Sequence, residues 1–385
     1  MTKAISWVKE NLLATKVDIF LTIIGAYFIY FILSLFLNFV FSSDWTLIEV
    51  NRKILLVGLF PEEDLWRIWS VFYVFSLLLT STISLVYGLQ IRTSIFYVFI
   101  LLIPFLIFTT INMIFHILIL IILSLLSYVF VYYLKRRSYR VILSRIIVIS
   151  WIIFIPFLFF VLVLGDGPKV TLWGGFFVNL ILAVIAILAG FPLGVIFALG
   201  RASSYKTIKL VSVVFIETFR GAPLIAWLFF AWFVLPNFLP DLFSLNDINL
   251  VIRAMIVLSL FSSAYVAEVV RGGLQSIPKG QKEAATALGL NTFLELLFIT
   301  MPQAIRIVIP AIVSTFIAIF KDTSLVFILG ITDLLRIGRL IPEQQQEFYG
   351  KSIEVLLIVA LLFWVVSIIL SQISRSIEKR LNVSQ

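Results

Sequence analysis

The sequence predicts an all-α polytopic membrane protein with about ten transmembrane helices, and three observations support this prediction. Hydrophobic residues make up 62% of the 385 residues, and Phe alone occurs 38 times. The mean hydropathy of +1.15 is too high for one water-soluble core, which would leave large apolar surfaces exposed. Apolar runs of roughly 20 residues, long enough to cross a hydrocarbon core of about 30 Å, recur along the chain. Lipid is therefore the expected solvent.

The first predicted span follows a short polar start and is too long for a signal-peptide core. No small-residue cleavage site follows it, so residues 1–41 are expected to stay as an anchor. The third and fourth spans are separated by a short turn and form a predicted helical hairpin. The predicted spans are 17–41, 68–88, 93–111, 114–134, 146–164, 174–199, 211–235, 249–272, 305–328 and 352–374.

The distribution of Lys and Arg predicts the orientation of these spans. With the N-terminus inside, seventeen of the 29 basic residues fall on the cytoplasmic side and six on the opposite side. This asymmetry follows the positive-inside rule and places both termini and residues 273–304 in the cytoplasm. The net charge of +9 is then explained by topology, and no nucleic acid partner is expected.

The chain is expected to divide near 165–173, where glycines and a proline separate long apolar runs. Residues 1–165 form a five-span N-terminal extension whose spans hold few polar residues. Residues 172–374 form a five-span block whose spans hold many, and 375–385 form a cytoplasmic tail. Polar groups are costly in a membrane, so they mark where water or substrate passes, or where they pair with one another. The second block is therefore expected to carry the function.

Several kinds of chemistry have no support in the composition. The chain has no Cys and a single His, His116, which argues against a metal site and against a Ser-His triad. No GxxxxGK[ST] phosphate-binding motif occurs, so any ATP must be hydrolysed by another chain. The chain is predicted to be neither an enzyme nor a metalloprotein.

The stretch FIETFRGAPLIAWLFF at 215–230 places two charges beside a glycine and a proline within a span. One interpretation is a structural kink in which Glu217 and Arg220, at i and i+3, satisfy each other. The other is a broken helix, because Gly221 removes side-chain bulk and Pro223 removes a backbone donor, which frees carbonyl groups toward a water-lined path. Both interpretations can hold together.

Two further constellations lie in later spans. Glu268 and Arg271, near the inner end of span 249–272, are interpreted as a structural ion pair rather than as substrate contacts. Lys321 and Asp322, deep in another span, are expensive unless paired. They are expected either to pair with Glu217 or Arg220, or to recognise an amino acid zwitterion together with the two hydroxyl residues that follow. The residues assigned to a substrate pathway are Glu217, Arg220, Gly221, Pro223, Asp322, Thr323 and Ser324.

A polar segment at 276–303 interrupts the apolar spans. Pro278 and Gly280 are expected to end the preceding helix, and QKEAATALG to open a new one, with Glu283 in its first turn and Gly289 at its end. One interpretation is an amphipathic helix lying on lipid, but an Ala-rich face buries little area in a bilayer. A docking helix for a soluble partner is favoured.

Residues 264–310, AYVAEVVRGGLQSIPKGQKEAATALGLNTFLELLFITMPQAIRIVIP, resemble the EAA-loop signature of type I ABC importer permeases of the polar amino acid subfamily. RGAPL and KDTSL also resemble that subfamily, so the similarity covers about 172–374. The ATPase-coupling residues that match the family motif are Glu283, Ala284, Ala285, Gly289, Pro302 and Gln303.

The resemblance implies a permease of amino acids, with a coupling helix seated in a separate ATPase. It implies as partners an ABC ATPase dimer that holds ATP and Mg²⁺, a second permease or a second copy of this chain, and a periplasmic or lipid-anchored amino-acid-binding protein. No cofactor is expected in this chain, and the expected location is the bacterial inner membrane. The long N-terminus is similar to that of general L-amino acid permeases, while Trp227 stands where the family pattern has glutamine.

The alternative function is an ion-coupled secondary transporter of small polar solutes. Such a protein is expected to show two similar inverted halves with acidic residues near the midplane. The two halves of this sequence differ in polarity and show no internal repeat. A membrane-embedded enzyme has still less support, because no cluster of catalytic residues is found.

Overall fold

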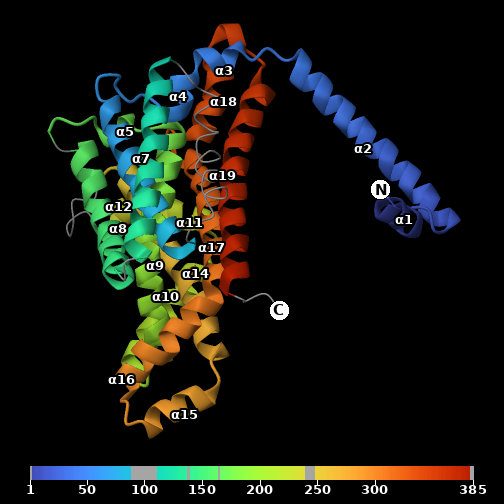
Figure 1. The fold of residues 1–385 in the computed structure, drawn as a ribbon. Coiled ribbons are helices and arrows are strands. Elements are labelled where there is room, and N and C mark those ends of the chain that lie inside the picture. The colour runs from blue at the N-terminus through green and yellow to red at the C-terminus, as the bar shows by residue number, and fades with distance from the viewer. Residues whose placement is uncertain (1, 88–110, 137–138, 164, 239–247, 382–385) are drawn as a thin grey trace. The chain divides into compact units, whose positions relative to one another are not determined.

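The structure is a computed structural model that describes residues 2–87, 111–136, 139–163, 165–238 and 248–381. Within these ranges the regular elements are helices (Figure 1). The chain forms two compact units, Met1–Val50 and Asn51–Gln385.

The first unit contains α1 (Thr2–Asn11), α2 (Lys16–Ser42) and α3 (Thr46–Val50). The start of α2 is fixed by a capping box, in which the Asp18 amide donates to the Thr15 hydroxyl (3.1 Å) and the Thr15 amide donates to the Asp18 carboxylate (2.9 Å). No residue of α2 is buried. A helix that is apolar on every side is suited to lipid contact.

The second unit is a bundle of long helices joined by short ones. The helices are α4 (Arg52–Val57), α5 (Leu65–Tyr87), α7 (Ile111–Arg136), α8 (Arg140–Val163), α9 (Gly175–Ala202), α10 (Lys206–Gly221), α11 (Leu224–Phe229), α12 (Leu235–Phe238), α14 (Leu250–Ser276), α15 (Lys279–Ala287), α16 (Thr292–Glu295), α17 (Met301–Asp322), α18 (Leu334–Gln344) and α19 (Ser352–Leu381). Short 3₁₀ segments are η1 (Val170–Leu172), η5 (Thr323–Leu329) and η6 (Gln346–Phe348), and π-helical segments are η2 (Phe230–Val234) and η4 (Leu296–Thr300).

Eight helices in the described ranges are long and apolar enough to cross a membrane, and they coincide with eight of the predicted spans. The predicted span 211–235 is instead a pair of helices, Lys206–Gly221 and Leu224–Phe238, bent by 102°. The predicted span 93–111 falls outside the described residues except for Ile111, whereas the turn predicted at 112–113 is wrong, because these residues lie inside helix α7. The membrane character and the all-α class predicted from the sequence are therefore confirmed.

The closest packing in the bundle joins α9 to α14. Gly190 and Gly194 of α9 lie four residues apart and face serines of α14. A Cβ atom built on Gly190 would lie 2.7 Å from the Ser262 Cβ, and one on Gly194 would lie 2.7 Å from the Ser263 carbonyl oxygen. Such spacing of small residues lets two helix backbones approach closely in a membrane protein.

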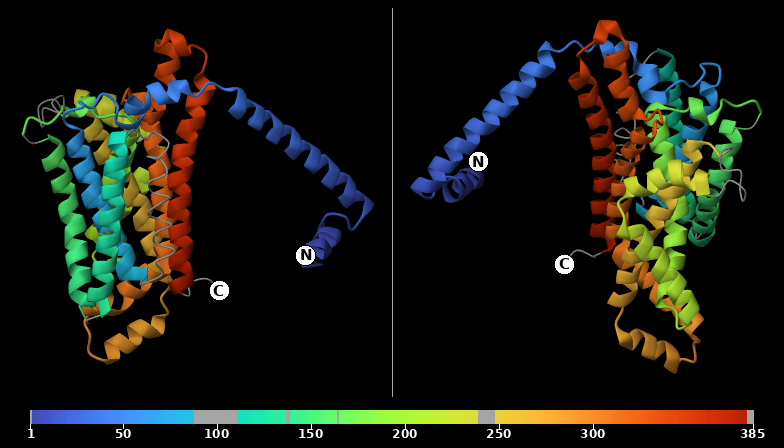
Figure 2. Two further views of the ribbon diagram at one scale, coloured as in Figure 1. Left: turned by 45° about the horizontal axis from the view of Figure 1, so that its top comes forward. Right: turned by 180° about the vertical axis from the view of Figure 1, so that it is seen from behind.

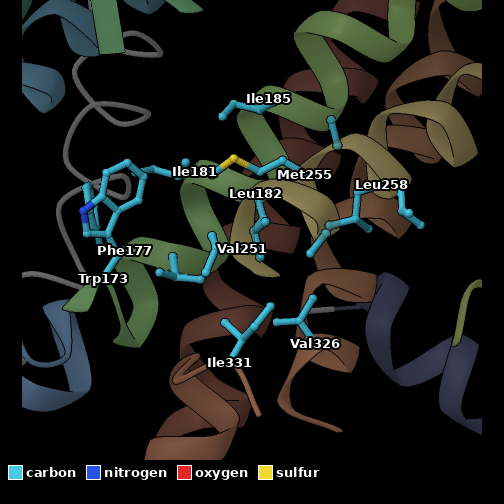
Figure 3. Packing of buried hydrophobic residues seen from close by; sticks show 14 of the residues in the cluster. Trp173, Phe177, Ile181, Leu182, Ile185, Val251, Met255, Leu258, Val326 and Ile331 are labelled. Atoms are coloured by element: carbon cyan, nitrogen blue, oxygen red, sulfur yellow. The ribbon is translucent and has the colours of Figure 1, made fainter. Parts of the chain in front are cut away.

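A continuous apolar core lies where the N-terminal halves of α9 and α14 pack together (Figure 3). Trp173, just before α9, and Phe177 and Leu182 within it belong to one cluster with Met255 and Leu258 of α14. The same cluster includes residues that precede position 165, namely Phe60, Ile68, Val71, Phe154, Leu158 and Leu162. The division into 1–165 and 172–374 stays a prediction, but the described helices on both sides of it share one core.

The polypeptide crosses itself at the start of α9. Gly175 has φ = +59°, a left-handed conformation that favours glycine, and its amide donates to the Thr332 carbonyl oxygen (2.8 Å). A Cβ on Gly58 would lie 2.4 Å from the Gly174 Cα. The glycines predicted to mark a linker therefore serve a tight crossing of three chain segments.

Candidate functional site

The segment 277–300 lies beyond one end of the bundle, and we call it the protruding segment (Figures 1 and 2). It joins the end of α14 to the start of α17 and contains α15 and α16. Its helix α15 begins directly after Pro278, which is the N-cap residue. The helix therefore starts earlier than predicted: Gly280 lies inside it rather than ending the previous helix, and Glu283 is its fifth residue rather than a first-turn residue.

Gly289 reverses the chain after α15. Its φ is +75°, its amide donates to the Thr286 carbonyl oxygen (2.9 Å), and the Leu290 amide donates to that of Ala285 (3.1 Å). These bonds satisfy carbonyl groups at the end of the helix, as in a glycine C-terminal motif. No atom lies within 4 Å of a Cβ built on Gly289, so the backbone conformation rather than space favours glycine here.

The surface of the protruding segment mixes charges with exposed apolar side chains. Glu283 and Ala284 are exposed, while Ala285 is buried against the rest of the segment. Leu288 is 79% exposed and Phe293 is 68% exposed. Large apolar side chains that stand exposed beside charged residues indicate a surface for a protein partner.

Side-chain hydrogen bonds hold residues 291–303, which lead from the protruding segment back into the bundle. Asn291 caps α16 by accepting a hydrogen bond from the Leu294 amide (2.9 Å), and the buried Glu295 accepts one from the Thr300 hydroxyl. Pro302 is the second residue of α17 and comes directly after the π-helical turn η4. Gln303 donates to the Ile299 carbonyl oxygen (3.0 Å). The protruding segment is therefore continuous with α17 through η4.

Five charged side chains from the C-terminal parts of α9, α10 and α14 meet, and we call them the charge cluster. Arg201 Nη1 lies 2.7 Å from Glu217 Oε1 and 3.4 Å from Glu268 Oε2. Arg220 Nη1 lies 3.4 Å from Glu268 Oε2, and Arg271 Nε lies 3.0 Å from Glu268 Oε1. Glu268 and Arg271 thus pair as the sequence suggested. The expected pairing of Glu217 with Arg220 is wrong, because each bonds across to another helix.

The helix that carries Glu217 and Arg220 is broken as one interpretation predicted. α10 ends at Gly221, Ala222 is extended, and α11 starts after Pro223 at an angle of 102°. Trp227 in α11 stacks on Phe219 in α10, with ring centroids 4.6 Å apart, so an aromatic contact spans the break. The segment then passes into the π-helical turn η2.

The KDTSL stretch has a different environment from the one expected. In the part of the chain that the structure describes, Glu217 and Arg220 bond within the charge cluster, so the predicted pairing of Lys321 or Asp322 with them is wrong. Thr323 is fully buried and donates to the Phe320 carbonyl oxygen (2.7 Å). The Ser324 hydroxyl donates to the Lys321 carbonyl oxygen (2.8 Å). The pathway role of these residues stays a prediction.

Thr323 belongs to a buried polar network that sequence reasoning missed. The Asn179 side-chain amide donates to the Thr323 hydroxyl and to the Asp333 carboxylate, at 3.2 Å each. Its oxygen accepts from the Leu334 amide (3.0 Å), and burial raises the pKa of Asp333 to about 6. The signal for Asn179 was present, since it is a lone amide in a long apolar span. Arg201 was missed because nothing local links it to residues 16 positions away.

In the described ranges no group of three or more His, Asp or Glu side chains is placed to hold a metal ion. The described residues form a protruding segment, a charge cluster shared by three helices and a broken helix. η5 packs on α11, so the two irregular stretches lie together. Interrupted helices in membrane proteins line cavities where solutes bind.

Comparison with known proteins adds to this picture. Residues 190–383 match a family model described as binding-protein-dependent transport system inner membrane component. The inner membrane amino-acid ABC transporter permease protein YhdY of Escherichia coli K12 is 39% identical over 241 residues, 61% of this chain and 65% of that protein. The glutamate/glutamine/aspartate/asparagine transport system permease protein BztC of Rhodobacter capsulatus is 42% identical over 209 residues, 54% of this chain and 48% of that protein. The chain thus spans less than two thirds of the length of these two relatives.

A shorter relative is covered more fully. The glutamate/aspartate import permease protein GltK of Escherichia coli O157:H7 is 32% identical over 209 residues, 54% of this chain and 91% of that protein. A crystal structure of an amino acid ABC transporter with histidines is 31% identical, with a TM-score of 0.46 over 54% of this chain and 92% of that one. The family model alone covers half of the sequence. The resemblance drawn from the sequence is thereby confirmed, and this chain belongs to the family of binding-protein-dependent transport system inner membrane components.

Proposed function

We propose that this chain is the permease subunit of an ATP-driven amino acid importer, in which the protruding segment receives motion from separate ATPase subunits. The proposal depends on the position and the exposed surface of the protruding segment. It presents Glu283, Leu288 and Phe293 outside the bundle and connects directly to α14 and α17. Those two helices pack on each other and on α9. A push on the segment therefore acts on the centre of the bundle.

The substrate class is supported by the relatives and by the chemistry of the chain. The relatives are named for amino acids, and several for glutamate or glutamine. The break at Gly221 and Pro223 lies beside a charge cluster with three arginines and two carboxylates. Polar amino acids carry both charges of a zwitterion, so a path lined by both signs of charge suits them.

The mechanism that fits is alternating access. A secreted or lipid-anchored binding protein delivers the amino acid, ATP and Mg²⁺ bind to an ATPase dimer, and closure of that dimer moves the protruding segment. The second half of the transport path comes from a second permease or a second copy of this chain. In this arrangement the N- and C-termini face the cytoplasm, because the protruding segment must meet the ATPase there.

The test is uptake by proteoliposomes that contain this chain with its co-purified partners. Glu283→Lys is expected to lower amino acid uptake per ATP hydrolysed roughly tenfold, equivalent to about 1.4 kcal/mol of coupling. Gln281→Lys is the matched control, since it adds positive charge to the same exposed helix outside the EAA element, and its uptake is expected to stay near wild type.

Two results would overturn the proposal. One is wild-type uptake by Glu283→Lys with unchanged ATP use. The other is uphill uptake by the isolated chain, driven by a proton or sodium gradient with no ATPase present, which is the behaviour of a secondary transporter.

A further inference from the structure

A cavity of about 460 Å³ lies among the first turns of α5, α7 and α9, away from the charge cluster and the protruding segment. All three helices are long and apolar enough to span a membrane. The cavity therefore lies at one membrane face, at the level where the spans begin. Its volume falls within the range of about 300–1,000 Å³ that is typical of ligand sites.

The rim of this cavity carries charges of both signs. Arg52 and Lys53 come from α4, while Glu62 and Glu63 come from the loop that follows it. Lys53 Nζ lies 3.1 Å from Glu62 Oε1, and these side chains are 42% and 78% exposed. An exposed pair of this kind is worth little, so its members are able to exchange partners with a ligand at small cost. The rim is suited to a head group that carries an anion and a cation.

One wall of the cavity is a rigid aromatic group. The rings of Trp69 and His116 stack with centroids 4.5 Å apart and an interplanar angle of 7°, and the Tyr73 hydroxyl lies 2.6 Å from His116 Nδ1. Trp66, also in the lining, is 55% exposed at the first turn of α5. Tryptophan favours the head-group level of a bilayer, where its ring meets both water and lipid.

A second cavity of about 210 Å³ adjoins the first. The two share Phe72, Phe176, Phe177 and Leu180 in their walls, and the second continues between α5, α9 and α19. Its hydroxyl groups bond to one another or to backbone: Ser76 to Ser124, and Thr80 to the Ser76 carbonyl oxygen. What remains for a ligand is an apolar surface.

We propose that the two cavities together bind one phospholipid with an ethanolamine head group. The phosphate lies at Arg52 and Lys53, and the ammonium lies at Glu62 and Glu63. One acyl chain passes Leu180 into the apolar cavity. A free amino acid has the same two charges but is too short to fill both cavities. The site is independent of the proposed transport function, because it depends only on binding.

The experiment is native mass spectrometry of the full-length chain after delipidation, with phosphatidylethanolamine, phosphatidylglycerol or phosphatidylcholine added back. Wild type is expected to retain one phosphatidylethanolamine and to prefer it, since the quaternary ammonium of phosphatidylcholine has no N–H to donate to a glutamate. Leu180→Trp fills the junction of the cavities and is expected to lower retention on the order of tenfold. Leu118→Trp is the matched control, because Leu118 is 51% exposed on α7 and lines neither cavity.

Equal retention in both tryptophan variants would overturn the proposal. Equal binding of phosphatidylglycerol or phosphatidylcholine would overturn the assigned head group, and leucine or glutamate binding in place of lipid would overturn the ligand class. A photoactivatable phosphatidylethanolamine on the wild-type chain keeps the test valid if Leu180→Trp does not fold. Labelling within 65–72 or 176–180 is expected, and labelling confined to the exposed face of α7 would contradict the site.

Discussion

The carboxyl group of Asp333 is fully buried at the start of α18, although it accepts hydrogen bonds from the Arg336 amide (3.0 Å) and from Asn179 (3.2 Å). Burial dominates and raises its pKa from 3.8 to about 6. Between pH 3.8 and about pH 6, the Asp333 carboxyl group is protonated in the folded chain and ionised in the unfolded chain. The contribution of Asp333 to stability is therefore present at low pH and is lost as the pH rises through about 6.

Asp333→Asn is expected to remove this pH dependence while keeping an oxygen that caps α18. From pH 5 to pH 7.5, wild type is expected to lose about 1.4 kcal/mol of stability relative to the variant. Thermal unfolding in detergent at both pH values checks this. Parallel shifts of wild type and variant would contradict a titration of the Asp333 carboxyl group between these two pH values.

Gly289 and Gly280 form a natural pair for testing backbone conformation. Neither has an atom within 4 Å of a built Cβ, but only Gly289 has a positive φ. Gly289→Ala is expected to strain the end of α15 by about 1–2 kcal/mol, whereas Gly280→Ala is expected to stabilise the helix by about 1 kcal/mol. Hydrogen exchange of residues 279–290 measures both effects, with faster exchange expected in the first variant and slower in the second. Equal exchange would contradict the strain.

Some contacts of the charge cluster and the polar network could be predicted from the sequence and others could not. The difference is how far apart the partners lie along the chain. Glu268 and Arg271 are three positions apart on one helix, so their pairing follows from helix geometry. Arg201 reaches Glu217 only because α9 and α10 fold back on each other, which no local pattern encodes. Thr323 and Asp333 likewise meet through Asn179, far away in sequence.

Among the helices, the α9–α14 seam is the contact most sensitive to volume. Gly190→Leu or Gly194→Leu would place side-chain atoms where Ser262 or Ser263 now lie. The helices must then separate, and each variant is expected to lose about 1–3 kcal/mol of stability or more. Gly25→Leu on α2 is the matched control, because nothing lies within 4 Å of its built Cβ. Thermal unfolding in detergent compares the three, and equal midpoints would contradict the close approach.

Hydropathy located the spans well because crossing a bilayer needs a long apolar run, whatever its neighbours. Hydropathy did not predict the angle between α10 and α11 at Gly221 and Pro223. A proline allows a kink, but the packing of Trp227 on Phe219 fixes the direction in which α11 leaves the break. The early start of α15 was also missed. Pro278 was interpreted as the end of one helix, whereas it is equally suited to begin the next.

For the whole molecule, the orientation across the membrane is a prediction that this chain makes easy to test. It contains no cysteine, so single cysteines can be introduced without removing any. Gln281→Cys in the protruding segment is expected to react with a membrane-impermeant maleimide only when the cytoplasmic face is open to it. Glu62→Cys is expected to react only from the opposite face. Labelling of both positions from one side would contradict the proposed topology.

The continuity of α14 has a mechanical consequence. It runs without a break from Leu250 to Ser276, and 27 residues at about 1.5 Å per residue make a rod of about 40 Å. Its midsection is clamped to α9 at Ser262 and Ser263, so these two helices are expected to tilt as one stiff lever. A displacement at Ile277 is then transmitted along α14 to Val251. The bending needed for gating is expected instead in the neighbouring broken helix α10–α11.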